Sequence, residues 1–132
     1  MEKEFDKGKI FFRLHENGII EYGYQDNIHI TAEMINENFV DYWSFVDGHI
    51  GKEAKFLTLI TVPKKVTISQ AAMKLTSELY KPTEHRVIKL GYVCPSKVSK
   101  ILVYILNRFK NPSYEYKIFT NRQKAEDWLL SN

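Results

Sequence analysis

The chain has 132 residues, 44% of them hydrophobic and 27% charged, which is the composition of one folded globular domain. The net charge of +3 is too small to indicate nucleic-acid binding, and no apolar run approaches the roughly 20 residues that cross a bilayer. The N-terminus carries no apolar signal segment, and a single cysteine, Cys94, can form no internal disulfide. We therefore expect one domain over residues 1–132, located in the cytoplasm, with neither a membrane nor a nucleic acid as partner.

The first predicted elements are a β-hairpin and a long helix. Residues 1–8 are polar, and we expect them to be frayed. Residues 9–15 alternate between apolar and polar, the following Asn-Gly pair favours a tight turn, and residues 19–24 form the returning strand. Thr31 is expected to cap a helix that ends at Gly48 or Gly51.

That helix carries a cluster of four aromatic residues, Phe39, Tyr42, Trp43 and Phe45. One buried stripe does not need all of them. We expect most to lie in the core, and Tyr42 or Phe45 to face a partner, which could be a second copy of the chain.

The fold is expected to be organised around residues 55–79. Residues 56–62 are apolar at consecutive positions, which is typical of a strand buried on both faces. A lysine-bearing bend follows at residues 63–65, and Ser69 is expected to cap a helix over residues 70–80.

Two further strand–helix pairs complete the chain. Strands are predicted over residues 86–93 and 114–119. The helix between them begins at Pro95 or Ser96, and its amphipathic stripe comprises Val98, Ile101, Leu102, Ile105, Leu106 and Phe109. A capping box from Thr120 to Gln123 is expected to open the last helix. This order predicts an α/β fold with a mixed sheet of about five strands, comprising an N-terminal hairpin and a parallel portion, and about four helices.

The sequence contains no recognisable catalytic or metal-binding pattern. The four histidines share no spacing typical of zinc sites, and neither common glycine-rich phosphate-binding motif occurs. Cys94 precedes a predicted helix whose N-terminus would favour a reactive thiolate, but the alternative is a small buried side chain. We expect no enzyme, no metal and no cofactor.

Lysines near two strand ends are the best candidate for a binding surface. Lys64 and Lys65 follow one predicted strand, and Lys97 and Lys100 follow the next. Open α/β sheets bind ligands at this edge, and two helix N-termini expected there would favour an anion. The charge distribution also favours a basic binding surface in the second half of the chain. Residues 1–60 hold 6 basic and 11 acidic residues, whereas residues 61–132 hold 13 basic and 5 acidic residues. The asymmetry favours an acidic partner or self-association, although solvated surfaces explain it as well.

The C-terminal segment carries a family resemblance. Residues 112–120 read Pro-Ser-Tyr-Glu-Tyr-Lys-Ile-Phe-Thr, and residues 125–129 read Ala-Glu-Asp-Trp-Leu. A strand leading to Phe-Thr, a polar turn and Ala-x-x-Trp-Leu on the last helix resemble the ending of STAS-like domains, bacterial proteins similar to the anti-sigma-factor antagonists. The N-terminal hairpin and the strand–loop–helix over residues 57–79 also match the layout of that fold.

The resemblance implies a non-catalytic regulatory domain that binds an unidentified protein partner. In anti-sigma-factor antagonists the helix after the central strand begins with Asp-Ser, and a partner kinase phosphorylates the serine. Here Ser69 stands in place of the acid, Gln70 replaces the serine, and Thr61 replaces a strand-end Asp, so the usual phosphoserine is missing. The expected interaction or ligand rim comprises Lys64, Lys65, Ser69, Gln70, Lys97 and Lys100.

The alternative implied by the resemblance is a carrier of a small apolar or anionic molecule, because STAS-like folds resemble those of lipid-transfer proteins. A carrier predicts a sizeable pocket between helices and sheet, whereas an interaction domain predicts a filled core. An enzyme that uses Cys94 is a third possibility, with the least support.

Overall fold

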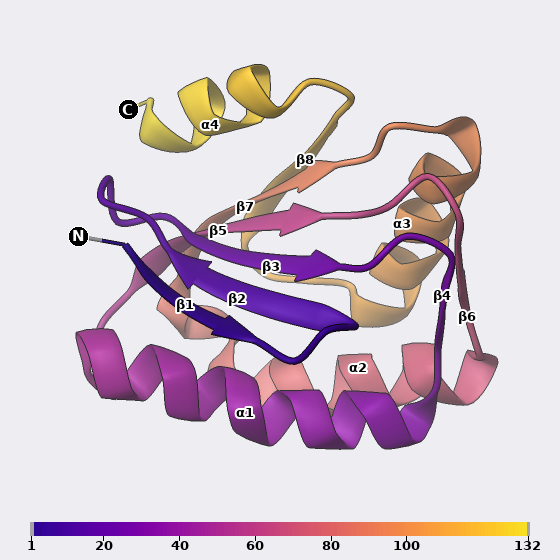
Figure 1. Ribbon diagram of the computed structural model, residues 1–132, viewed down its shortest axis with the longest axis horizontal. Coiled ribbons are helices and arrows are strands. Elements are labelled where there is room, and N and C mark those ends of the chain that lie inside the picture. The colour runs from indigo at the N-terminus through magenta and orange to yellow at the C-terminus, as the bar shows by residue number, and fades with distance from the viewer. Residues whose placement is uncertain (1, 132) are drawn as a thin grey trace.

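A mixed β-sheet of six strands, with helices on both faces, forms the centre of the computed structural model, which describes residues 2–131 (Figure 1). In spatial order the strands are β1 (Lys3–Asp6), β2 (Ile10–Leu14), β3 (Ile20–Tyr24), β5 (Phe56–Thr61), β7 (Val87–Val93) and β8 (Glu115–Phe119). Strands β1, β2 and β3 pair antiparallel, and β3, β5, β7 and β8 pair parallel. The predicted α/β fold with a hairpin and a parallel portion is confirmed, with six strands instead of about five.

Helices cover the two faces of the sheet unequally. The helices α1 (Ala32–Ile50), α2 (Gln70–Tyr80) and α3 (Lys97–Lys110) lie on one face, and α4 (Arg122–Leu130) lies alone on the other (Figure 1). A 3-10 helix, η1 (Lys81–Arg86), joins α2 to β7. None of the helices in the described part of the chain is both long and apolar enough to cross a membrane.

The expectation that residues 1–8 are frayed is wrong for the described residues from Glu2 onward, because β1 forms an edge strand of the sheet, and Met1 lies outside the described residues. Its register places Phe5 opposite Phe12, and the two rings stack with centroids 5.4 Å apart. The other three residues of β1 are charged and exposed, as is common on strands that protect a sheet edge from further pairing. Because only one of the four residues of β1 is apolar, the sequence shows no alternation of apolar and polar residues there.

Two of the three predicted helix N-caps, Thr31 and Ser69, are confirmed, and Ser96 caps α3 in addition. The side chains of Thr31, Ser69 and Ser96 each accept a hydrogen bond from a backbone N–H in the first turn of α1, α2 and α3. The cap of α4 is Asn121 and not Thr120, since the side-chain oxygen Oδ1 of Asn121 accepts a hydrogen bond from the Lys124 N–H at 3.1 Å.

A second, two-stranded sheet was not predicted. Strand β4 (Ile28–Ile30) pairs parallel with β6 (Val66–Ile68), and the Ser69 N–H donates to the Ile30 carbonyl at 3.0 Å. The small sheet therefore runs along one side of the molecule and holds the N-termini of α1 and α2 together (Figure 1).

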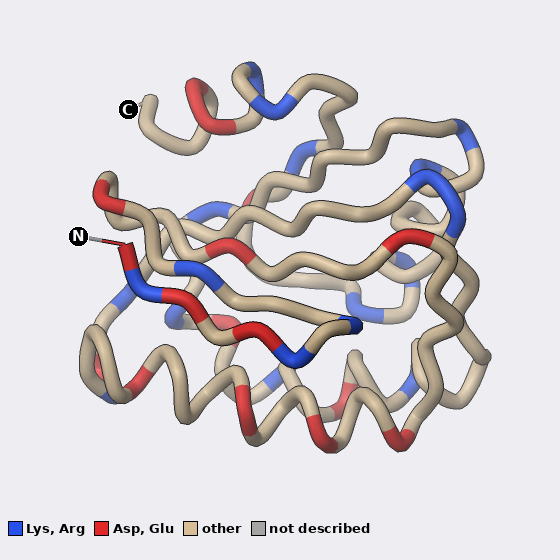
Figure 2. The backbone as a smooth tube through the Cα atoms, viewed as in Figure 1, with Lys and Arg blue, Asp and Glu red and all other residues tan. Residues whose placement is uncertain are grey.

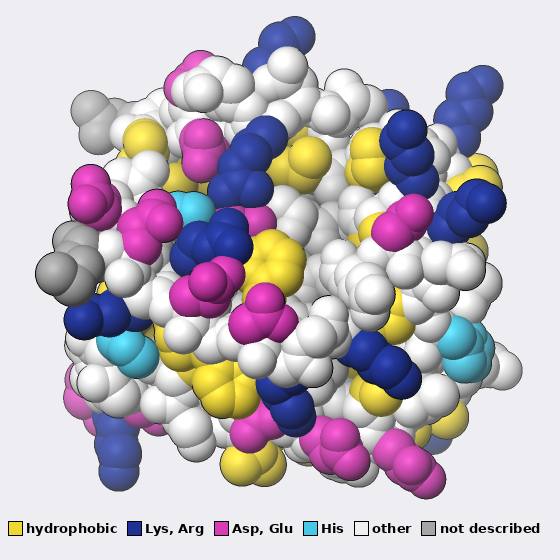
Figure 3. Space-filling view, viewed as in Figure 1, with side chains coloured by type: hydrophobic (Ala, Val, Ile, Leu, Met, Phe, Trp, Pro, Cys, Tyr) yellow, Lys and Arg dark blue, Asp and Glu magenta, His cyan; other side chains and the backbone are white. Residues whose placement is uncertain are grey.

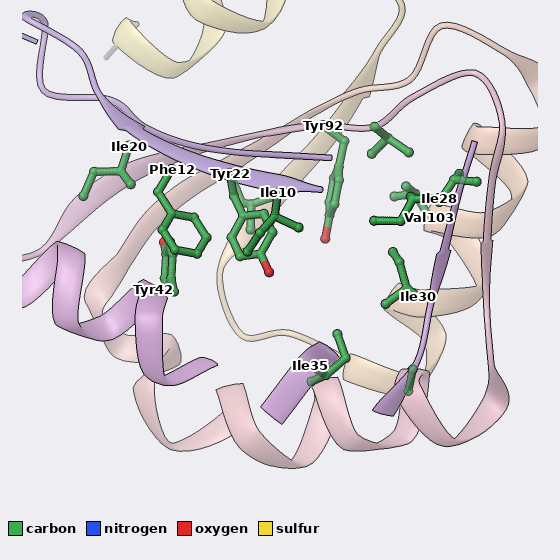
Figure 4. Close-up of a cluster of buried hydrophobic side chains, with 14 of the residues drawn as sticks. Ile10, Phe12, Ile20, Tyr22, Ile28, Ile30, Ile35, Tyr42, Tyr92 and Val103 are labelled. Atoms are coloured by element: carbon green, nitrogen blue, oxygen red, sulfur yellow. The ribbon is translucent and has the colours of Figure 1, made fainter. Parts of the chain in front are cut away.

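The main core lies between the sheet and α1, α2 and α3. Phe12, Tyr22 and Tyr92 project toward these helices from three strands (Figure 4). Tyr42 and Phe45 of α1 are only 4% and 6% exposed, so the expectation that one of them faces a partner is wrong. On the opposite face, a smaller cluster joins Ile19 and Leu59 to two residues of α4, Ala125 and Leu129.

Candidate functional site

The loops after β5 and β7 bring three lysines to one edge of the sheet. The Ser96 hydroxyl donates to the Lys64 carbonyl at 2.9 Å, which joins the two loops, and Lys64, Lys65 and Lys97 are exposed. Lys100 lies half-buried in the first turn of α3. Basic residues gather at this corner of the molecule (Figures 2 and 3). We call Lys64, Lys65, Lys97 and Lys100 the lysine rim.

Ser69 and Gln70 do not belong to the lysine rim. The extended strand β6 separates them from Lys65, and four residues of strand span roughly 13 Å. The N-terminus of α2 therefore lies at the far end of the small sheet, and of the two expected helix starts only that of α3 lies at the rim. The Ser69 hydroxyl accepts the Ala72 N–H at 3.1 Å, which gives this serine a structural role as the cap of α2.

The outer face of α3 is apolar and exposed. Among the described residues, eight large hydrophobic side chains are exposed, and five of them belong to this helix: Val98, Ile101, Tyr104, Ile105 and Phe109. The predicted stripe therefore divides, because Leu102 and Leu106 turn inward with Val103, whereas Ile101 is 58% exposed. A helix that is apolar on both faces normally has both faces covered.

All charged residues of α3 itself are basic. Lys97, Lys100 and Arg108 lie on α3, and the helix contains no acidic residue. An open groove continues from Val98 to the lysine rim and the small sheet, and Lys64, Lys65 and Thr67 line it. We call Val98, Ile101, Tyr104, Ile105 and Phe109 the α3 stripe. The rim and the stripe form one continuous surface.

A cavity of about 110 Å³ remains between the sheet and α1, α2 and α3. Its lining is mainly apolar, yet four of the lining residues carry a buried polar atom with no hydrogen-bond partner within 3.5 Å: Tyr22 Oη, Trp43 Nε1, Thr58 Oγ1 and Tyr114 Oη. Tyr22 makes only weaker contacts with Tyr24 and Asn38, and Thr58 makes one with Tyr42. Glu84 of η1 and Lys110 of α3 lie at its polar end, and burial lowers the pKa of Lys110 to about 8. The core on this side is therefore not completely filled, but about 110 Å³ is well below the roughly 300 Å³ at which ligand pockets usually begin, so the cavity is not the sizeable pocket that a carrier predicts.

The opposite face of the sheet holds an ionic cluster that sequence analysis missed. Glu21 is 1% exposed, and its carboxylate accepts hydrogen bonds from Arg122 at 2.6 and 3.0 Å and from the Thr61 hydroxyl at 3.1 Å. His15 Nε2 lies 2.7 Å from the same carboxylate. Burial opposes ionisation of Glu21, but the hydrogen bonds from Arg122 and His15 outweigh it and hold its pKa below the ordinary value. Because 101 residues separate Glu21 from Arg122, no local pattern could have indicated the pair.

Cys94 does not have the surroundings of a nucleophile. Its side chain is fully buried, and burial raises the pKa of its thiol to about 11. A thiol with such a pKa is protonated at neutral pH and reacts poorly. Across residues 2–131, no three His, Cys, Asp or Glu side chains are grouped as a metal site would need.

A comparison with solved structures identifies a protein with a similar fold. A crystal structure of an uncharacterised protein of the DUF3478 family from Shewanella loihica PV-4, described as having a SpoIIAA-like fold, is similar with a TM-score of 0.59 and 15% sequence identity. The match covers 98% of this chain and 92% of that one. It confirms the STAS-like resemblance at the level of the fold.

No curated protein matches the sequence. A family model does match residues 12–132, which is nearly the whole chain. The chain thus has a STAS-like fold and belongs to the family described as domain of unknown function DUF7793.

Proposed function

We propose that this protein is a non-catalytic, cytoplasmic regulatory domain that binds an acidic protein partner through the α3 stripe and the adjoining lysine rim. The observation that carries the proposal is the exposure of five large apolar side chains on one helix. Contiguous apolar surface of this kind is uncommon on soluble monomers and marks interaction sites.

The partner is expected to offer an apolar ridge bordered by carboxylates. Val98, Ile101 and Ile105 are spaced so that they follow one side of α3, which suits an amphipathic helix packed along it. Lys97 and Arg108 border the stripe and would meet the acidic residues of such a helix.

The same charges disfavour a homodimer through this face. Pairing α3 with α3 of a second copy would place Lys97, Lys100 and Arg108 close to their own equivalents, with no acidic residue on either helix to compensate. We therefore assign the face to a different protein.

The proposal can be tested by crosslinking in the native cell. A photoreactive residue at position 101 should capture a specific acidic protein, whereas the same residue at position 40, an exposed apolar position on α1, should not. Binding of the purified partner to the double variant Ile101→Asp, Ile105→Asp should then weaken by at least about 30-fold, as expected when hot-spot residues worth about 2 kcal/mol are lost.

Val40→Asp is the matched control, because it also adds a charge at an exposed apolar position but lies on α1. It should bind like the parent protein, and all variants should unfold at similar urea concentrations. Equal affinity of the α3 variant and the parent would refute the proposal. Capture of a second copy of the chain, or binding to anionic lipid vesicles without any protein partner, would refute it as well.

A further inference from the structure

We infer that the cavity between the sheet and α1, α2 and α3 is a binding site for a small, neutral, mainly apolar molecule that carries a hydrogen-bond acceptor. The site differs from the surface proposed for the protein partner, because the cavity lies on the inner side of α3 and the α3 stripe lies on the outer side.

The volume of the cavity limits the size of the molecule. About 110 Å³ is somewhat less than the roughly 150 Å³ of an engineered apolar cavity that holds benzene. A five-membered ring, or a six-membered ring with little substitution, fits these dimensions. Larger lipids do not, unless the helices move apart.

Unpaired polar groups show that the cavity is more than a packing defect. The Trp43 indole N–H and the Tyr114 hydroxyl are buried without a hydrogen-bond partner. The hydroxyls of Tyr22 and Thr58, residues that are 5% and 3% exposed, make only weak contacts with neighbouring side chains. Buried polar groups without a partner destabilise a fold and are uncommon in native proteins. Two such groups and two weakly bonded hydroxyls around one cavity indicate that a bound molecule supplies the missing hydrogen bonds.

The types of these groups point to an acceptor on the ligand. The indole N–H of Trp43 can only donate, so its partner has to be an acceptor. Burial raises the pKa of the Tyr22 and Tyr114 hydroxyls well above the ordinary value, so both keep the proton that they can donate. A carbonyl or ether oxygen satisfies such donors.

The charged residues in the lining favour a neutral ligand. The Glu84 carboxylate already lies 3.2 Å from Lys81 Nζ and accepts from the N–H and hydroxyl of Ser113 at 3.4 Å. Lys110 has a lowered pKa and lies with its amine over the ring of Tyr114 at 5.4 Å. A pKa of about 8 leaves the Lys110 amine mostly protonated at pH 7, and the Glu84 carboxylate attracts it. The lining therefore carries one positive and one negative charge and has no net charge that would select an ionic ligand.

Three probes of similar size separate the possibilities: cyclopentanone has an acceptor, cyclopentane has none, and cyclopentanecarboxylate is an anion. We expect cyclopentanone to bind best and to shift the indole N–H resonance of Trp43 in the ¹⁵N spectrum of the full chain. Trp128 is the internal control, because it packs against the opposite face of the sheet beside Phe119. Its indole resonance should not move.

The matched pair Trp43→Phe and Trp128→Phe tests the donor. In Trp43→Phe, the ratio of cyclopentanone affinity to cyclopentane affinity should fall by about tenfold, the equivalent of about one hydrogen bond, and in Trp128→Phe it should not change. If Trp43→Phe does not fold, Tyr22→Phe should reduce the same ratio.

Three results would overturn the inference. The first is that no probe binds and the four polar groups hold ordered water instead. The second is equal affinity for cyclopentanone and cyclopentane, and the third is preference for the carboxylate, which would assign the site to an anion. None of these results involves the partner protein, so each would leave the proposed role of the α3 stripe intact.

Discussion

The two faces of the sheet differ in whether their buried polar groups have hydrogen-bond partners. Beneath α4, Glu21 is buried with its carboxylate bonded to Arg122 and Thr61 and in contact with His15. Beneath α1, α2 and α3, the Trp43 indole N–H and the Tyr114 hydroxyl are buried and have no hydrogen-bond partner. The first arrangement is complete without any ligand, whereas the second is not.

This difference separates a structural cluster from a candidate binding site. A perturbed carboxyl group beside a histidine and an arginine has the composition of an active site, and composition alone would rank it above a group of tyrosines. The geometry reverses that ranking, because the carboxylate has its hydrogen bonds already and α4 covers it. Unmet hydrogen-bonding capacity is the better guide to function in this protein.

The largest expected effect comes from breaking the complete cluster. Arg122→Ala leaves Glu21 buried with only its weaker partners, and we expect the free energy of unfolding to fall by about 2–3 kcal/mol at pH 7. This is less than the cost of breaking a fully buried ion pair, because the Arg122 side chain is 40% exposed. Urea titration measures the loss, and Lys124→Ala, an exposed change on the same helix, should alter stability by less than about 0.5 kcal/mol. A similar small loss for Arg122→Ala would show that the cluster contributes little.

Acid should remove part of the same interaction. The pKa of Glu21 is lower in the folded protein than in the unfolded chain, where it is about 4.3. The stability that its ionised form contributes is therefore fully present above about pH 4.3 and is lost as the pH falls through the folded pKa. Urea midpoints between pH 7 and pH 3 should fall less steeply for Glu21→Gln than for the parent, whereas Glu78→Gln, at an exposed position on α2, should follow the parent. Parallel curves for Glu21→Gln and the parent would contradict the assignment.

The smallest effect is expected in the incomplete region and should have the opposite sign. Tyr114→Phe removes a hydroxyl that has no partner, so we expect the empty protein to become more stable by about 1 kcal/mol. Tyr22→Phe removes a hydroxyl with only weak contacts and should stabilise the protein by a smaller amount. Tyr92→Phe is the matched control on the same cavity, because the Tyr92 hydroxyl donates to Asn107 at 3.4 Å. That change should destabilise the protein slightly. Destabilisation by all three changes would mean that the first two hydroxyls have partners in solution.

Elements with strong local signals were predictable from the sequence. The Asn-Gly turn, the apolar run of β5 and the cap at Ser69 each depend on residues that are adjacent in the chain, and all three are present. The edge strand β1 and the small sheet were missed, because four- and three-residue strands are too short to show a period. Their pairing depends on distant segments.

The candidate sites were less predictable than the fold. Periodicity identified the stripe of α3, but it does not reveal that Ile101 and Ile105 lie outside the core. The expected rim included Ser69 and Gln70 because the residues before Ser69 were expected to form a loop. They form the extended strand β6 instead. The cavity takes its lining from three helices and several strands, so it has no signature in any one segment.

Helix α3 borders both candidate sites. Val103 and Leu106 line the cavity, and Ile101 and Ile105 are exposed on the outer face of the helix. If a molecule in the cavity displaces this helix even slightly, the affinity of an outer partner changes by some factor. Thermodynamic reciprocity then requires that the partner change the affinity of the enclosed molecule by the same factor. A rigid 14-residue helix with one side in each site is thus sufficient to couple them, without a hinge, a lid or a phosphorylated serine.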